Sequence, residues 1–246
     1  MATIIKPPYF EQVVNAGEKK LLDFLEVNLP DNYFLIPNVE IASTNPKNFR
    51  TQYWEYDLIV VTPHAIFNIE NKDWKGRIEG DDNYWYLNDR QMSNPLKTGR
   101  QKTAVLASKL KEHNPNWGRA WIQNMLTLSY DNVYHPVISS DAYKLTFMLN
   151  DRLLDYIWNP INVGKNEDAI EDIRTDIVKF LSGQQSKKHS YCSRSQLCQK
   201  LRNQTPGQDP HPDIFLYVPD GVCRRWPQSP DQPRNRRYRS SIQLYP

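Results

Sequence analysis

Four residues on two neighbouring apolar segments have the types and spacing of a hydrolytic site. Asp57 lies in the segment YWEYDLIVV, and Glu70, Asn71 and Lys72 end the next one, AIFNIENK. Two carboxylates that lie close together repel each other unless a cation or a proton lies between them. Carboxylate oxygens, together with a main-chain carbonyl such as that of Asn71, are the ligands that Mg²⁺ prefers. The pattern therefore indicates a divalent metal site with an ammonium group beside it.

A metal at this position would support phosphodiester hydrolysis. It would lower the pKa of an attacking water and offset the charge of the transition state. Lys72 would orient that water or stabilise the same charge. The alternative is a solvated strand end, because Glu-x-Lys is common there and an Asp entering a strand is often a turn residue. On the local spacing alone, the solvated strand end is the commoner explanation.

The two apolar segments predict an antiparallel hairpin. Pro63 suits the second position of a type I turn over Thr62–Ala65. A loop centred after Pro63 pairs residues whose numbers sum to 127, which places Asp57 opposite Glu70 at about 5 Å between Cβ atoms. Lys72 shares the face of Glu70 because side chains alternate along a strand. The apolar composition predicts that both faces of this hairpin are covered.

Helices and strands alternate around the hairpin. The leucines of Phe10–Leu29 recur at spacings of three and four, which predicts a helix that Pro30 ends. A helix is also predicted over Thr98–His113, with Ala104, Leu106, Ala107 and Leu110 on one side. Further strands are predicted in YFLIPNVEI, NYWYL, NVYHPVIS and KLTFML, and further helices in NDRLLDYIW and in NEDAIEDIRTDIVKFL, where Asn166 is the expected N-cap.

The character of the chain changes after Gly183, which predicts two regions. Residues 184–246 contain 11 Lys or Arg and 4 Asp or Glu, whereas residues 1–183 contain 20 and 24, so a basic tail follows an acidic body. The tail is rich in Pro, Arg and Ser, which predicts disorder or loose packing, although DIFLYV within it resembles a strand. We expect a domain over 1–183 and a tail over 184–246.

Cysteine usage and hydropathy predict a cytoplasmic protein. The three cysteines, Cys192, Cys198 and Cys223, all lie in the tail at spacings that do not suit a zinc ribbon, so we expect thiols rather than a disulfide framework. No apolar segment approaches the roughly 18 residues of a membrane span, and the N-terminus does not resemble a signal peptide.

Several features in order resemble the nuclease-related domain (NERD) family of the PD-(D/E)XK nuclease superfamily. They are an early helical glutamate in GEKKLLDFL, the run YDLIVVTPHAIFNIENKDWKGRI with its strand aspartate, E-x-K and W-x-G, the aromatic strand YWYL, and the Asn-Pro before a helix in SNPLKTGRQKTAVLASKL. The resemblance covers the body of the chain and not its tail. It implies an α/β fold with a restriction-endonuclease-like core, a mixed central sheet flanked by helices.

The resemblance also implies roles for individual residues. Asp57 and Glu70, with the main chain of Asn71, would bind Mg²⁺ or Mn²⁺, and Lys72 would position the nucleophilic water. Glu18 matches the family's auxiliary acid, but an exposed helix position explains a glutamate equally well.

Three further residues are candidates for contacts with nucleic acid. Family members often carry a glutamine shortly after the Asn-Pro; here Thr98 lies near that place and Gln101 is the first glutamine. Lys75 and Arg77 would meet phosphates, although a solvated pair explains them as well.

The resemblance predicts a metal-dependent nuclease that acts on DNA. The alternative is a non-catalytic module on the same scaffold that binds nucleic acid or a protein, and relatives of the family are also joined to kinase or helicase domains. Residues 224–239 of the tail contain six arginines with Trp226 and Tyr238 among them, a composition typical of nucleic-acid binding, although a terminus without function is the commoner explanation. No Gly-rich phosphate loop is present.

Overall fold

The computed structural model describes residues 1–6, 15–44, 49–130 and 135–185, and the backbone of two short strands further on. The chain divides into two units, Met1–Tyr191 and Cys192–Pro246. In the second unit the antiparallel strands β11 (Phe215–Tyr217) and β12 (Cys223–Arg225) are described, and β11 confirms the strand predicted in DIFLYV. The other predictions for the tail beyond Gln185 lie outside the described residues, including those for its thiols and arginine-rich end.

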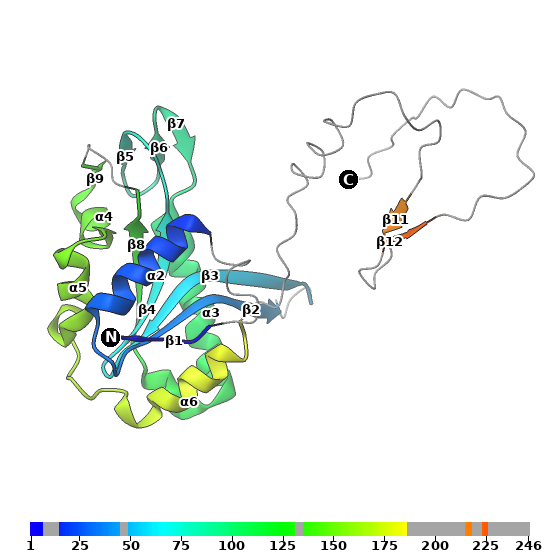
Figure 1. Cartoon of the computed structure of the whole chain (residues 1–246), viewed down its shortest axis with the longest axis vertical. Helices are drawn as coiled ribbons and strands as arrows, with labels where there is room; N and C mark the ends of the chain where they lie inside the picture. Colours follow the sequence, from blue (N-terminus) through cyan, green and yellow to red (C-terminus); the bar gives the residue numbers. More distant parts are fainter. Residues whose placement is uncertain (7–14, 45–48, 131–134, 186–214, 218–222, 226–246) are drawn as a thin grey trace, which may run out of the picture. The chain divides into compact units, whose positions relative to one another are not determined.

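A mixed six-stranded sheet forms the centre of the first unit (Figure 1). Its order is β1-β2-β3-β4-β8-β10. The neighbours β2, β3 and β4 are antiparallel, whereas β1 pairs parallel with β2, and β8 pairs parallel with both β4 and β10. The strands are β1 (Thr3–Ile4), β2 (Phe34–Thr44), β3 (Thr51–Val61), β4 (Ile66–Lys72), β8 (Ile122–Leu128) and β10 (Thr146–Met148).

Helices cover both faces of this sheet, as the continuous apolar strands predict. On one face, leucines of α2 (Ala16–Asn28) and α5 (Asp151–Trp158) pack on Leu58, Val60 and Phe67. On the other face, α3 (Pro95–His113) and α6 (Glu171–Ser182) pack on Ile59, Val61 and Ile66. The remaining helical segments are α4 (Ser140–Lys144), η1 (Pro115–Arg119) and η2 (Pro160–Val163).

A second, smaller sheet follows β4. Its order is β7-β6-β5-β9, and a third core cluster joins its Ile78 and Trp85 to Leu126 and Leu128 of β8. The strand predicted in NYWYL is observed as the shorter β6. The bounds are β5 (Ile78–Gly80), β6 (Trp85–Leu87), β7 (Arg90–Met92) and β9 (Val137–Ile138).

The structure confirms the α/β fold with a mixed sheet flanked by helices and corrects several elements. Strand β8, the parallel neighbour of β4, was not predicted, and the strand predicted in NVYHPVIS is only β9, with residues 131–134 outside the described part. The last helix begins at Glu171 with Ile170 as its N-cap, so the N-cap predicted at Asn166 is wrong. The first predicted helix is observed from Ala16, and residues 7–14 are not described.

Candidate active site

The hairpin has the predicted register and stops pairing at the acidic residues. Pairs of β3 and β4 run from Val61–Ile66 to Leu58–Ile69, each summing to 127 as expected. Asp57 and Glu70 lie one step beyond the last pair. There the N–H of Asn71 donates to Asp57 Oδ2 at 2.8 Å. The Asp57 carboxylate, rather than a backbone carbonyl of β3, therefore accepts the next hydrogen bond from β4. The two strands therefore separate where the site begins.

A break in the neighbouring ladder also lies at Asp57. The pairs of β2 and β3 run from Phe34–Val61 to Thr44–Thr51 but are interrupted at Asn38 and Asp57. Asn38 has a φ of 58°, a left-handed conformation that asparagine tolerates better than most residues. The alternation of side chains between the two faces of β3 shifts at the same point. Tyr56 and Ile59 are an odd number of residues apart, yet both pack in the core beneath α3. The local kink thus sets the direction in which Asp57 leaves the sheet.

Glu70 is held by two ammonium groups. Lys72 Nζ donates to Glu70 Oε1 at 2.7 Å, and Lys102 Nζ donates to Glu70 Oε2 at 2.5 Å. The first contact confirms that Lys72 shares the face of Glu70. The side chains of Glu70 and Lys102 are each 10% exposed, and that of Lys72 is 29% exposed. Both carboxylate oxygens are therefore engaged within the protein.

Lys102, which lies on the buried stripe of α3, was not predicted as a site residue. That stripe consists of Leu96, Gly99, Lys102, Leu106 and Leu110, whereas Ala104 and Ala107 are exposed, so the predicted side of the helix was wrong in part. The sequence did contain a signal for Lys102 as a site residue, because this lysine lies at helical spacing among apolar positions that are buried.

Polar contacts beneath α3 fix the place of Lys102. Asn68 and Asn124 are paired across β4 and β8, and their Nδ2 atoms donate to the carbonyls of Gly99 and Leu96. The hydroxyl of Tyr56 donates to the Lys102 carbonyl at 2.8 Å. These contacts dock the first turns of the helix onto the sheet, which brings the Lys102 ammonium to Glu70.

Glu18 has a structural role as well as a position near the acids. It forms a capping box with Asn15, whose Oδ1 accepts from the Glu18 N–H at 2.9 Å while the Glu18 carboxylate accepts from the Asn15 N–H at 3.2 Å. Burial, and next the charge of Asp57, raise the pKa of Glu18 to about 7. Gly17 brings this end of α2 against β4, because a Cβ there would lie 3.1 Å from the Nδ2 atom of Asn71 in that strand.

The electrostatics join the three acids and two lysines into one cluster. Burial, followed by the charge of Glu70, raises the pKa of Asp57. Burial alone would raise the pKa of Glu70, but Lys102 and Lys72 outweigh it and lower that pKa. The pKa of Lys72 is raised because the charges of Glu70, Asp57 and Glu18 outweigh its burial. Lys72 therefore contacts Glu70, and the charges of Asp57 and Glu18 act on the same lysine.

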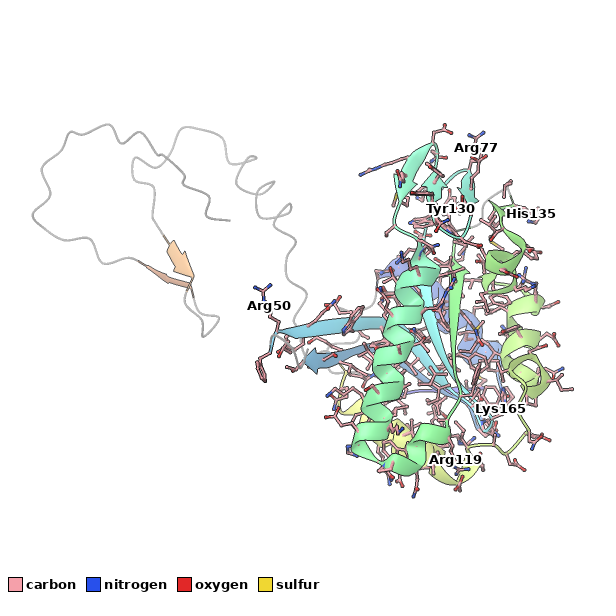
Figure 2. The ribbon with its side chains drawn as sticks, turned by 180° about the vertical axis from the view of Figure 1, so that it is seen from behind. Arg50, Arg77, Arg119, Tyr130, His135 and Lys165 are labelled. Carbon is pink, nitrogen blue, oxygen red and sulfur yellow. The ribbon has the colours of Figure 1, made fainter. Side chains whose placement is uncertain are left out.

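The predicted nucleic-acid contacts lie outside this cluster. Gln101 is exposed on α3, next to the inward-facing Lys102. Lys75 is exposed, and its Nζ lies 4.9 Å from the ring centre of Tyr130, whereas the Arg77 guanidinium pairs with Glu79 and Asp89. Figure 2 shows Arg77 and Tyr130 at the same end of the first unit.

A metal would have to be bound by a rearranged form of this cluster. Within the described ranges, no three His, Cys, Asp or Glu side chains converge into a group that could hold a metal ion. The donor chemistry nevertheless fits Mg²⁺ or Mn²⁺, because Asp57 and Glu70 offer carboxylate oxygens at the point where β3 and β4 separate. Asp57 is a desolvated carboxyl beside a second acid, an environment that additional positive charge stabilises.

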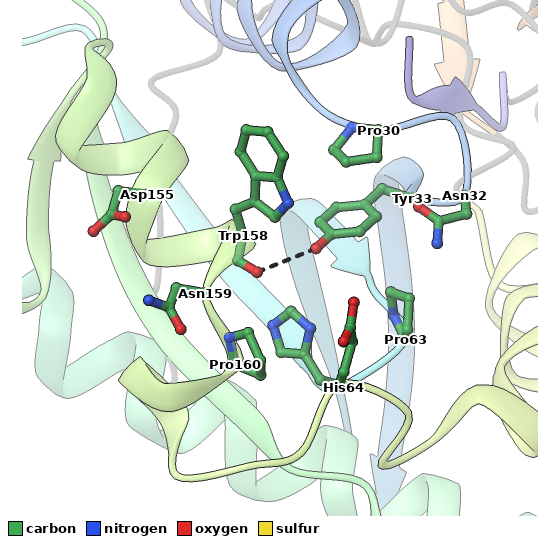
Figure 3. Close-up of a pocket in the computed structure, with 10 residues that line it drawn as sticks. Pro30, Asn32, Tyr33, Pro63, His64, Asp155, Trp158, Asn159 and Pro160 are labelled. Carbon is green, nitrogen blue, oxygen red and sulfur yellow. Dashed lines mark hydrogen bonds between the residues drawn. The ribbon is translucent and has the colours of Figure 1, made fainter.

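A cavity of about 610 Å³ lies at the other end of the hairpin (Figure 3). Tyr33, His64, Trp158 and three prolines line it, and the Tyr33 hydroxyl donates to the Trp158 carbonyl at 3.4 Å. His64 is 1% exposed, and burial lowers its pKa. None of the acids and lysines described above lines this cavity.

Comparison with known proteins supports the sequence interpretation. Residues 14–129 match the family model NERD, the nuclease-related domain. Neither a curated protein nor a solved structure matches the chain. The matched segment runs from just before α2 through β8 and includes all five members of the charged cluster. No helix in the described part of the chain is long and apolar enough to cross a membrane.

Proposed function

We propose that the protein is a metal-dependent nuclease that hydrolyses phosphodiester bonds of DNA, since residues 14–129 match the family model of the nuclease-related domain. The observation that carries the proposal is the convergence of Asp57, Glu70 and Lys72 where strands β3 and β4 separate. Here a carboxyl with a raised pKa, a doubly paired carboxylate and an ammonium group lie together. The nuclease-like fold alone would not support an activity.

The chain offers three oxygen ligands for Mg²⁺ or Mn²⁺. Asp57 and Glu70 provide carboxylates, and Asn71 provides a main-chain carbonyl. The N–H of Asn71 points to Asp57, and its carbonyl points to the same side because both groups of one residue in a strand share a direction. When bound, the metal would supply Lewis-acid activation of water and neutralisation of phosphate charge.

The other residues of the cluster have roles that do not depend on metal ligation. Lys72, which is partly exposed, would hold the attacking water or the oxygen on which charge develops. Glu18 would hold Lys72 in place, since its carboxylate is among the charges that raise the pKa of that lysine. Lys75 and Gln101 are exposed and would contact the nucleic-acid backbone, whereas Arg77 would first have to leave its two acidic partners.

One observation favours a second function, a non-catalytic module that binds nucleic acid or a protein partner. Both oxygens of Glu70 are occupied by lysines, so the metal site is not preorganised. A binding module would retain such a cluster as a structural feature. Metal binding decides between the two, because a ligand that binds the folded state raises its melting temperature. If Mn²⁺ does not raise the melting temperature of the full chain, the binding module is favoured.

The nuclease proposal is tested by cleavage of linear, circular and single-stranded DNA, and of RNA, with Mg²⁺ or Mn²⁺. We expect wild type to cleave DNA, and we expect Asp57→Asn, Glu70→Gln and Lys72→Met to lose roughly 10²-fold or more in rate. The matched control is Glu112→Gln, an exposed change on α3. Circular dichroism must show that each variant is folded. Full activity in the folded Glu70 and Lys72 variants would refute the proposal, and cleavage of RNA alone would change its substrate.

A further inference from the structure

We propose that Lys102 occupies the place of the metal on Glu70 in the metal-free protein, and that metal binding transfers its ammonium to a phosphate of the nucleic acid. This inference rests on the proposed function. The contact that carries it is the one between Lys102 Nζ and Glu70 Oε2, at 2.5 Å. A divalent cation bound to Glu70 would repel the Lys102 ammonium at such a distance, so metal binding and this ion pair compete.

The two lysines on Glu70 differ in what happens when they leave it. Lys72 has a side chain that is 29% exposed, so its ammonium can turn to water. Lys102 is 10% exposed and enters the site from a docked helix, so its ammonium remains buried when the contact is lost. A buried cation without a partner is strongly destabilising. Lys102 therefore needs another anion once the metal holds Glu70.

The described part of the chain places no further free acid beside Lys102. Asp57, the other acid whose charge acts with Lys102, would by then hold the metal. The third acid, Glu18, is engaged in the capping box of α2. The face of the Tyr56 ring lies 6.0 Å from the Lys102 ammonium and offers a weak cation–π contact at most. A phosphate oxygen of the substrate is the remaining partner of suitable chemistry.

The position of Lys102 is fixed strongly enough to support this exchange. Gly99 allows α3 to approach β8 closely, and Asn68 donates both to the Gly99 carbonyl and to the Thr103 hydroxyl. The Tyr56 hydroxyl holds the backbone of Lys102 itself. Because the backbone is fixed, the exchange needs only rotation of the lysine side chain.

The exchange predicts that metal and nucleic acid bind cooperatively. Metal alone must displace a buried ion pair, so its binding is weakened, and DNA restores that loss by pairing with the displaced ammonium. By linkage, DNA must tighten metal binding by the same factor by which metal tightens DNA binding. Removal of the ammonium should therefore strengthen metal binding and abolish part of this coupling.

The first test is calorimetric titration of the full chain with Mn²⁺ and no DNA. We expect Lys102→Met and Lys102→Gln to bind Mn²⁺ roughly tenfold more tightly than wild type, a change of about 1.4 kcal/mol. The glutamine variant keeps a hydrogen-bond donor for Glu70 without charge, and it serves if the methionine variant does not fold. Lys109→Met, on the same helix and paired with Glu112, is the control and should bind like wild type. Unchanged or weaker Mn²⁺ binding by a folded Lys102 variant would overturn the proposal.

The second test measures the affinity of the protein for a DNA duplex with and without Ca²⁺, a cation that takes the same class of oxygen ligand. Ca²⁺ should tighten DNA binding by wild type and by Lys109→Met, and should do so several-fold less for Lys102→Met. Equal tightening in all three proteins would overturn the second half of the proposal. Wild type that binds Mn²⁺ but cleaves nothing would refute the nuclease and leave the exchange standing. If wild type cleaves DNA but Lys102→Met binds Mn²⁺ no more tightly than wild type, the exchange is refuted and the nuclease proposal stands.

Discussion

Gly99 of α3 lies so close to Asn124 of β8 that a Cβ on the glycine would be 2.0 Å from the Asn124 Oδ1 atom. Both residues are buried, and Asn124 Nδ2 already donates to the Leu96 carbonyl in the same helix. The asparagine therefore has no simple way to move aside. The contact sets the distance between helix and sheet, and with it the reach of Lys102 toward Glu70.

We predict that Gly99→Ala lowers the free energy of unfolding by about 1–3 kcal/mol, the usual effect of overpacking a core. It should also weaken the cooperativity between metal binding and DNA binding, because a shift of α3 moves Lys102 relative to Glu70. Urea denaturation of the full chain measures the first effect. Gly118→Ala is the control: it is exposed in η1, where the nearest atom to a new Cβ is in the flexible Lys111 side chain at 3.4 Å. A stability change in Gly99→Ala no larger than in the control would show that the close contact is not restrictive.

Asp57→Asn should make the metal-free protein more stable and remove its response to metal. Burial and the charge of Glu70 both disfavour the ionised Asp57, whereas an asparagine has no charge to bury and keeps an oxygen for the Asn71 N–H. We expect a higher melting temperature than wild type at pH 8 without metal, and a smaller increase on addition of Mn²⁺. Thermal denaturation with and without Mn²⁺ checks both. A variant less stable than wild type would mean that Asp57 contributes mainly to the fold.

The titration of Glu18 should make stability fall as pH rises. Its pKa is raised from 4.5 to about 7, so the folded state binds the extra proton between these values and the unfolded state does not. Stability is then lost progressively from about pH 4.5 to 7. Glu18→Gln keeps the capping box but cannot titrate, so its stability relative to wild type should increase across this window and then stay level.

Denaturant unfolding at several pH values from 4 to 8 measures this difference, with Glu112→Gln as the exposed control. A difference between wild type and Glu18→Gln that does not change with pH would contradict the raised pKa.

Tyr56→Phe should remove one buried hydrogen bond from the backbone of Lys102. The hydroxyl donates to that carbonyl at 2.8 Å and is replaced by hydrogen without other change in the ring. We expect a loss of about 1 kcal/mol in stability, the usual net value of such a bond. Tyr53→Phe, exposed on the same strand, provides the comparison in chemical denaturation. Equal stability of the two variants would show that the hydroxyl does not hold α3.

His64 should lower the stability of the protein in acid. Burial lowers its pKa below the ordinary value of 6.5, so the unfolded chain takes up a proton that the folded state excludes. Stability is therefore present above pH 6.5 and is lost as pH falls below it. His64→Gln should lose less stability than wild type between pH 7 and 5 in a series of unfolding experiments. Parallel pH curves for the two proteins would argue against this.

The hairpin and the acids on it could be predicted from the residues alone. The symmetry of the turn around Pro63 fixes the register through residues that are neighbours in the chain, so the pairing from Val61–Ile66 to Leu58–Ile69 and the side on which Lys72 lies followed from counting. Period-2 and period-3.6 patterns likewise located most strands and helices. These relationships are local, and local patterns are readable without knowledge of what packs against them.

Which cations contact Glu70, and where the strands beyond it separate, depends on packing between distant segments. Lys102 lies 32 residues from Glu70 in sequence, and their contact depends on how α3 docks on Asn68 and Asn124. Strand β8, which carries Asn124, was itself not predicted. Gln101 was the predicted site residue of α3, but the rotation of the helix directs that side chain outward and its neighbour Lys102 inward. A rotation of one residue is set by packing between distant segments, so it could not be obtained from the spacing of residues along one segment.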